Sequence, residues 1–286
     1  MAERELFDFW RASSTLFGLI SFVCWSLSFY PQPLLNQKRK SIVGWNVDFP
    51  FLNVLGFAAY TVNTAVMLWS PAIREQYAYR YPASPEPSTR WNDFAFAAHA
   101  LVLCVVTYSQ VWPRIWGFEK GEDQKVTKPG WWIFGICLAA VAASVVAVLT
   151  LSPDGGYDPS GWAWIDVVSF LAIGVLGDDK MVITFYKYMP QALDNFKRKA
   201  TTGFSIWQIL LDLTGGVANI GQLLIDCSLE ADWSGLTGNP VKVGLSVITL
   251  FFDVIFVLQH YVLYPDSGDL KSSSSSCTPG EEGRSV

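Results

Sequence analysis

Charged residues are scarce in this 286-residue sequence. Asp, Glu, Lys and Arg together account for 16% of it, whereas hydrophobic residues account for 51% and aromatic residues for 15%. Ordinary soluble domains carry about 25% charged residues, so a single soluble core would leave much of this apolar surface in water. The composition excludes a typical soluble protein and indicates a chain that lies in a lipid bilayer.

Histidine and cysteine are also rare, with two and five residues respectively. Four of the cysteines fall within apolar runs, and their spacing matches neither a metal site nor an extracellular disulfide framework. The two histidines, His99 and His260, lack a paired nucleophile, and the sequence contains no phosphate-binding loop. We therefore expect no enzymatic activity, no bound metal or cofactor, and no nucleic-acid partner.

Long apolar runs, by contrast, occupy most of the chain. A membrane-spanning helix needs about 20 mostly apolar residues, and seven such runs occur, at residues 14–31, 46–69, 92–112, 131–151, 162–189, 204–227 and 242–264. The polar, acidic first twelve residues are unlike a secretory signal, so the first run is expected to stay in place as helix one. Residues 265–286, which include five consecutive serines, are expected to form a disordered tail.

Lys and Arg residues are unevenly divided between the two sides of these helices. If the N-terminus lies outside the cytoplasm, twelve of the 20 fall in cytoplasmic segments, six lie on the opposite side and two lie within the fifth run. Positive charge collects on the cytoplasmic side of membrane proteins. The sequence therefore predicts a luminal N-terminus and a cytosolic C-terminus.

The chain contains an internal repeat. Residues 31–56 and 190–215 align at a constant offset of 159, with shared Pro, Gln, Leu, Asn, Lys-Arg-Lys, Gly, Leu and Gly residues. The sequence thus predicts an all-α membrane protein in which seven helices form two parallel three-helix bundles joined by a linker helix. The expected units are residues 1–112 for the first bundle, 113–161 for the linker helix, 162–264 for the second bundle and 265–286 for a cytoplasmic tail.

The paired motifs YPQ and YMPQ resemble those of the PQ-loop proteins, and longer strings narrow the resemblance to the lysosomal cystine transporter family. These strings are SLSFYPQPLLNQKRKSIVGWNVDFPFLNVLGFAAYTVN, KYMPQALDNFKRKATTGFSIWQILLDLTGG and FFDVIFVLQHYVLY. The resemblance covers roughly residues 14–264. It implies proton-coupled export of L-cystine from the acidic lumen of a lysosome or vacuole to the cytosol by alternating access, with protons, L-cystine and the lipid bilayer as partners.

Ionisable side chains lie within the apolar runs, where charge is costly and usually functional. Asp212 is near the middle of the sixth run, with Gln208 one turn before it, and Asp253 is near the middle of the seventh. Lys180 and Lys187 are seven residues apart in the fifth run, which places them about 10 Å apart along one helix face. An internal salt bridge, for example between Asp212 and Lys180, is the structural alternative.

Cystine has an ammonium and a carboxylate at each end, so its site needs cations together with acids or amides. By resemblance, the expected substrate-binding residues are Lys180, Lys187, Asn195, Gln208, Asp212, Asn53 and Asp48. The expected proton-coupling residues are Asp253, Asp212 and Asp93, although Asp93 at a helix start is equally suited to be an N-cap. Gln208 departs from the family, which has Asn at this position.

The two PQ motifs are expected to act as hinges. Pro31 with Gln32, and Pro190 with Gln191, stand at the ends of apolar runs, where a proline removes a backbone donor and kinks or ends its helix. A simple helix stop before each basic loop is the alternative, and hinge motion is what the resemblance implies.

Two other functions stay open. Asp178 and Asp179 depart from the family pattern by placing two acids before Lys180, and additional acids favour an exporter of a different, basic amino acid. A pH-sensing receptor of the same architecture would bind its ligand without moving it across the membrane.

Overall fold

The computed structural model describes residues 2–82, 85–87, 89, 91–176, 178–230 and 240–265, and within these ranges it does not describe the side chains of residues 2–4, 170, 172–185, 187, 230 and 240–246. Every secondary-structure element in the described ranges is a helix, as expected for an all-α protein. The only β-type pairing in those ranges is an isolated bridge between Ser41 and Glu119. The expected tail lies almost wholly outside the described residues.

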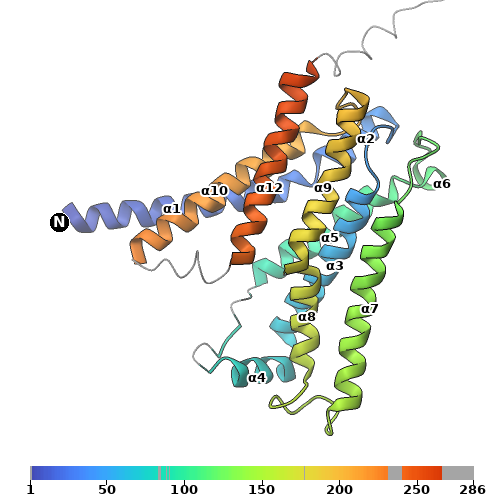
Figure 1. The fold of residues 1–286 in the computed structure, drawn as a ribbon. Coiled ribbons are helices and arrows are strands. Elements are labelled where there is room, and N and C mark those ends of the chain that lie inside the picture. The colour runs from blue at the N-terminus through green and yellow to red at the C-terminus, as the bar shows by residue number, and fades with distance from the viewer. Residues whose placement is uncertain are drawn as a thin grey trace, which may run out of the picture.

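Helices follow one another along the described chain with short connections (Figure 1). Their bounds are α1 Ala2–Ser28, α2 Pro31–Arg39, α3 Asp48–Trp69, α4 Pro71–Arg80, α5 Trp91–Ser109, α6 Pro113–Trp116, α7 Lys128–Leu151, α8 Trp164–Leu176, α9 Asp178–Arg198, α10 Ile206–Glu230, α12 Pro240–Leu258 and the π-helix η1 Gln259–Leu263. The short helices α4 and α6 lie between the apolar runs and were not expected.

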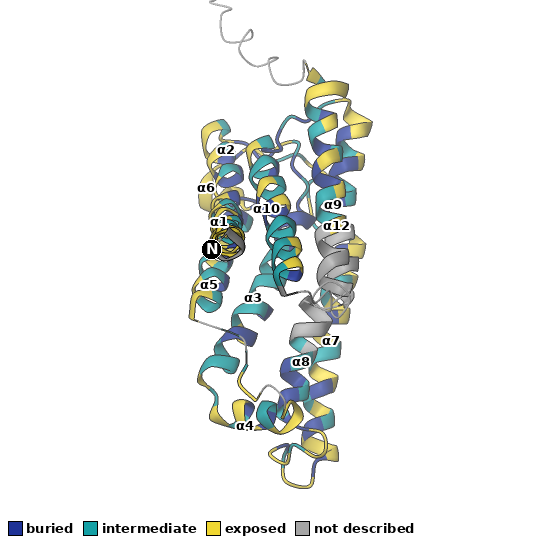
Figure 2. Ribbon diagram, turned by 90° about the vertical axis from the view of Figure 1, so that its left-hand side faces the viewer, coloured by how far each residue is buried: buried dark blue, intermediate teal, exposed yellow. Residues whose placement is uncertain are grey.

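Five helices in the described part of the chain are long and apolar enough to cross a membrane. They cover Glu5–Arg39, Asp48–Trp69, Trp91–Ser109, Lys128–Leu151 and Ile206–Leu229, and a shorter apolar helix covers Val247–Leu263. Much of α1 is exposed (Figure 2), and its large exposed side chains include Phe9, Leu16 and Leu19. Such a surface is stable against lipid chains, and the chain is a multi-pass membrane protein.

The two PQ prolines differ in their effect on the helices. α1 ends at Ser28 and α2 begins at Pro31, where a proline in the first turn loses no helical hydrogen bond. Pro190, however, lies inside α9, which continues to Arg198. A simple helix stop at Pro190 is therefore wrong, because the helix accommodates the missing donor and runs on for two further turns.

The repeats pack against each other as well as within themselves. α1 runs beside α10, and α3 packs against both α8 and α9 (Figure 1). The first repeat's opening helix thus lies on the second helix of the other repeat, and the reverse also holds. A mainly aromatic core joins α3, α9, α10 and α12, and its largest buried members are Trp45, Phe49, Tyr188, Phe204, Phe252 and Phe256.

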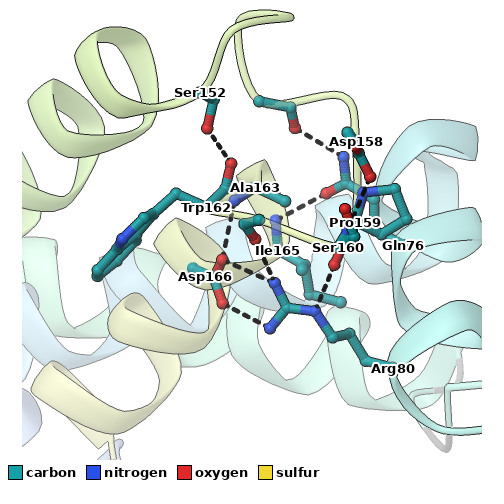
Figure 3. Close-up of polar contacts among 12 residues, drawn as sticks. Gln76, Arg80, Ser152, Asp158, Pro159, Ser160, Trp162, Ala163, Ile165 and Asp166 are labelled. Carbon is teal, nitrogen blue, oxygen red and sulfur yellow. Dashed lines mark hydrogen bonds and ion pairs between the residues drawn. The ribbon is translucent and has the colours of Figure 1, made fainter.

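Arg80 fixes α4 to the segment between α7 and α8 (Figure 3). Its Nη1 and Nη2 atoms lie 3.0 Å from Oδ1 and Oδ2 of Asp166, and its Nε and Nη2 donate to the carbonyls of Pro159 and Gly161 at 2.8 Å. Gln76, one turn earlier, accepts from a backbone amide of α8 and donates to two loop carbonyls. This end of the molecule is therefore held by a dense set of directed bonds.

Candidate functional site

Gln32 of the first PQ motif bonds to the loop of the second repeat. Its side chain is buried, and its Nε2 donates to the carbonyl of Gly203 at 2.9 Å while its Oε1 accepts from the amide of Ser205 at 2.8 Å. Nε2 also donates to Oδ1 of Asn36, one turn later on α2, at 2.9 Å. A buried amide that is satisfied in this way fixes the distance between the two repeats.

Gln191 of the second PQ motif makes the equivalent bonds to the loop of the first repeat. Its Nε2 donates to the carbonyl of Gly44 at 3.2 Å, and its Oε1 accepts from the amide of Asn46 at 2.7 Å. Its Nε2 also donates to Oδ1 of Asn195 at 2.9 Å. Every residue in this second set of bonds corresponds to a residue of the first set at the repeat offset of 159. The two halves are therefore joined by a pseudo-twofold network, which we call the reciprocal glutamine lock.

Gly44 and Gly203 are required where the two loops meet. Both have φ of 95°, a left-handed conformation that residues with a Cβ rarely adopt. A Cβ on Gly44 would overlap the carbonyl oxygen of Thr202, and one on Gly203 would overlap that of Val43. Glycine therefore permits both the turn and the close approach of the loops.

The two asparagines extend the lock to more distant helices. Asn36 donates to Oε1 of Gln110 at 2.8 Å, and Asn195 donates to Oε1 of Gln259 at 3.1 Å. Both asparagines are fully buried. Asn195, an expected substrate residue, is thus placed in the lock and does not line the pocket described below.

A positive charge lies against the lock. Nη2 of Arg198 donates to the carbonyl of Gly44 at 2.6 Å and to Oδ1 of Asn195 at 3.1 Å. Arg198 lies at the end of α9, beyond the expected span, and burial lowers the pKa of its guanidinium, an effect that the neighbouring Asp194 carboxylate opposes. The basic loop thus contributes contacts between the repeats as well as charge.

A small pocket, partly open to the outside, lies beside the lock. Both repeats line it, with Asn53 on α3 and Gln208 on α10. The structure therefore brings together two of the expected substrate residues with the PQ residue Gln32. The complete lining is Phe29, Gln32, Trp45, Phe49, Pro50, Asn53, Cys104, Thr107 and Gln208.

Tyr188 bonds to one of the expected acidic residues and packs against the helix that carries another. Its hydroxyl donates to Oδ2 of Asp212 at 3.0 Å, and the charges of both Asp212 and Asp253 act on it. Asp253 is fully buried on α12, and the ring of its neighbour Phe252 stacks on that of Tyr188 with centroids 5.6 Å apart. Tyr188 is not among the residues expected from the sequence, although its place in the YMPQ motif is a signal that could identify it.

Asp48 begins α3 and holds the start of α7. Its Oδ1 accepts from the amide of Thr127 at 2.8 Å, and its Oδ2 accepts from the Thr127 hydroxyl at 2.7 Å. Thr127 is the N-cap of α7, so a carboxylate at this position also suits the positive end of the helix dipole. Asp48 is fully buried and lies outside the pocket lining.

The remaining expected residues are Asp93, Lys180 and Lys187. Asp93 is half-buried in the first turn of α5, and its charge acts on Tyr60 of α3. The side chains of Lys180 and Lys187 lie outside the described residues, as do those of Asp178 and Asp179. The alternative salt bridge between Asp212 and Lys180 therefore stays a prediction. Among the side chains that are described, no group of three or more His, Cys, Asp or Glu residues could hold a metal ion.

Comparison with known proteins agrees with the internal repeat. Residues 13–73 and 173–232 match the model of the PQ loop repeat. The chain is 36% identical to a Dictyostelium discoideum protein named cystinosin homolog, over 88% of this chain and 81% of that protein. It is 30% identical to a Saccharomyces cerevisiae protein named cystine transporter, over 90% of this chain and 96% of that one.

A longer relative is also similar. The chain is 40% identical to a cystinosin homolog of Caenorhabditis briggsae over 87% of its own residues, and it spans 57% of that protein. The similarity in all three cases reaches far beyond the two matched repeats, so it includes α5, α7 and α12.

Proposed function

We propose that this chain, which belongs to the cystinosin family of PQ-loop proteins, carries L-cystine together with protons from the acidic lumen of a lysosome or vacuole into the cytosol by alternating access. The N-terminus is luminal and the C-terminus cytosolic in this proposal. The yeast relative is named a transporter, which agrees with a chain that catalyses no reaction.

The observation that carries the proposal is the reciprocal glutamine lock beside a pocket lined by both repeats. Carriers built from two repeats bind their substrate between the halves and rock one half against the other. In the lock, Gln32 and Gln191 each bond to backbone groups of the opposite repeat. Separation of the loops on this side requires all four of these bonds to break, so the lock is the closed cytosolic gate.

In this proposal each repeat forms one three-helix bundle. α1, α3 and α5 form the first three-helix bundle, α7 is the linker, and α8 with α9, α10 and α12 form the second bundle. This parallel arrangement places the basic loops after α2 and α9 on the same side of the membrane, as the distribution of Lys and Arg requires. Pro31 and Pro190 lie one residue before the lock glutamines and are the hinges that let the loops part.

The pocket is the substrate site. Asn53 and Gln208 supply amide groups, Asp212 supplies a carboxylate for one ammonium, and Lys180 and Lys187 supply cations for the carboxylates. Asp48 and Asn195 are bonded to protein groups in this conformation, so they contact cystine only after the lock opens.

The acids beside Tyr188 are the proton site. Burial of a negative charge is costly, and Asp253 has no exposed surface. A proton taken up from the acidic lumen removes that charge and permits the two halves to rearrange. Asp212 shares the proton site through Tyr188, and Asp93, at the start of α5, is the acid on the luminal side.

Uptake of labelled L-cystine into proteoliposomes with an acidic exterior tests substrate and coupling together. We expect saturable uptake that needs the pH gradient, decreases in Lys180→Ala and Asp253→Asn, and is unaffected by excess lysine, arginine or glucose. Competition by lysine or arginine would instead identify an exporter of basic amino acids. Ligand binding by a protein without any flux would contradict the carrier and favour a receptor.

A further inference from the structure

A second line of polar side chains runs between α1 and α10, away from the pocket. Three serines of α1 are buried at intervals of seven residues, namely Ser14, Ser21 and Ser28. Asp212, Asn219 and Asp226 recur at the same interval on α10, and residues seven apart share one face of a helix. We call this line the α1–α10 seam.

The contacts show that the two helices run antiparallel along the seam. Near the middle of α1, the hydroxyl of Ser14 donates to Oδ1 of Asp226. One turn later, a Cβ on Gly18 would lie 2.7 Å from Oε1 of Gln222, so that amide lies on the glycine. The seam therefore contains a carboxylate and an amide that neither the substrate site nor the proton site uses.

Ser21 shows that the seam is more than a packing surface. It is 3% exposed, and its hydroxyl oxygen has no hydrogen-bond partner among the described residues. Small polar residues often join membrane helices by hydrogen bonds between them, but the Ser21 hydroxyl bonds to no described residue of α10. An unsatisfied hydroxyl is costly in a buried position, and a water molecule between α1 and α10 would satisfy it.

The repeat shows how this seam differs from its counterpart in the other half. At the offset of 159, Ser21 and Ser28 correspond to Lys180 and Lys187 of the second repeat, and Asp212 corresponds to Asn53. The second repeat thus has cations at the positions where the first repeat has hydroxyl groups. Between Ser14 and Ser28, the α1 side of the path has no fixed positive charge that would repel a proton.

We propose that the α1–α10 seam is a water-accessible path that delivers protons from the N-terminal end of α1 to Asp212 and Tyr188. This role rests on the proposed proton-coupled transport. The ionisable groups along the path and at its ends are Arg11 on α1, Asp226 and Asp212 on α10, Tyr188 on α9 and Asp253 on α12.

Trp25 divides the path in this conformation. A Cβ on Gly215 would lie 2.7 Å from Cδ1 of the Trp25 ring, so the ring covers the glycine. Gly215 is within about one turn of both Asn219 and Asp212. The ring therefore separates the outer seam from the acid at its inner end, and a proton passes only when Trp25 moves, which prevents a leak.

Thiol labelling tests the water in the seam without any transport assay. In full-length protein whose native cysteines are replaced by alanine, Ser21→Cys is reacted with a charged, membrane-impermeant methanethiosulfonate from the side of the N-terminus. Leu19→Cys, at an exposed position of α1 that faces lipid, is the matched control. Because only a hydrated thiol ionises readily, Ser21→Cys should react at least about tenfold faster. Equal, slow labelling of both in folded protein would overturn the proposal.

Asp226→Asn tests the path itself and does not depend on the folding of the cysteine variants. We expect it to lose most of the proton-driven cystine uptake but to keep cystine counterflow at equal pH, which needs no net proton movement. Thr214→Val, at an exposed position of α10 where the hydroxyl bonds within its own helix, should change neither. Unchanged proton-driven uptake, or equal loss of both activities, would overturn the path. Absence of flux in the unmodified protein would refute the proposed function instead, and the labelling experiment would still decide whether the seam holds water.

Discussion

Gln32 and Gln191 make the same pair of bonds in opposite directions across the molecule. Each donates to a glycine carbonyl and accepts from the backbone amide two residues further along the opposite repeat's loop. The glutamine of each PQ motif therefore positions the other half of the protein. In the proposed mechanism the proline beside each glutamine is the hinge, and the bonds of the glutamine hold the loops together until that hinge moves.

Replacement of either lock glutamine should destabilise the protein. Gln191→Leu leaves the amide of Asn46 without its partner and the carbonyl of Gly44 with Arg198 as its remaining donor, and an unsatisfied buried group costs about 1–3 kcal/mol. We expect a decrease of several degrees in the midpoint of thermal unfolding in detergent. Gln37→Leu, on the exposed side of α2, is the matched control and should leave the midpoint unchanged; equal midpoints for both variants would refute the lock.

The loop glycines should be intolerant of alanine. Gly203→Ala forces a Cβ into a left-handed backbone and against the carbonyl of Val43, and such strain costs about 1–3 kcal/mol. Gly56→Ala is the control, because no atom lies within 4 Å of a Cβ built on that helical glycine. Thermal unfolding should show a lower midpoint for Gly203→Ala and an unchanged or higher one for Gly56→Ala. The reverse order would mean that the two loops do not meet.

Tyr188→Phe should separate proton coupling from cystine binding. The change removes the hydroxyl that bonds to Asp212 but keeps the ring stacked on Phe252. We expect a large decrease in pH-driven uptake with cystine binding preserved in an equilibrium assay. Tyr261→Phe, at an exposed position of η1, is the control. Full pH-driven uptake by Tyr188→Phe would remove the tyrosine from the proton site.

The Arg80 contacts should matter more than the neighbouring surface ion pair. Arg80 makes a two-pronged ion pair with Asp166 and two bonds to carbonyls, whereas Arg74 and Glu86 form one exposed contact at 3.5 Å. Exposed pairs contribute about 0–1 kcal/mol, and hydrogen bonds to charged groups contribute about 1.5–3 kcal/mol. Arg80→Ala should therefore lower the unfolding midpoint clearly and Arg74→Ala hardly at all. Similar effects of the two changes would contradict this reading of the loop.

The sequence was sufficient for the repeat and for much of the site's composition. The offset of 159 relates both glutamines, both loop glycines and both asparagines of the lock, because a duplicated chain keeps the residues that its duplicated loops require. Asn53 and Gln208, which the resemblance marks as substrate-binding residues, line one pocket. The partners of Asp48 and Asn195 could not be predicted, because Thr127 and Gln259 are remote in sequence and fall outside the repeat alignment.

Helix boundaries were harder to predict than the repeat. A proline usually ends a helix, yet α9 continues through Pro190 for two more turns. The two PQ motifs are similar in sequence but differ in helix structure, because α1 ends before Pro31. Tyr188 was not predicted either, because its position in an apolar run is typical of a core residue. Its hydroxyl partner, Asp212, lies on another helix.

The most direct test of the account is the electrical current that L-cystine evokes in proteoliposomes adsorbed on a solid-supported membrane. Cystine is a zwitterion near neutral pH, so its movement together with protons carries net positive charge. We predict a current that increases as the exterior is acidified and that is abolished by Asp253→Asn. Cystine flux without current, and equal at all values of the pH gradient, would contradict a proton-coupled carrier.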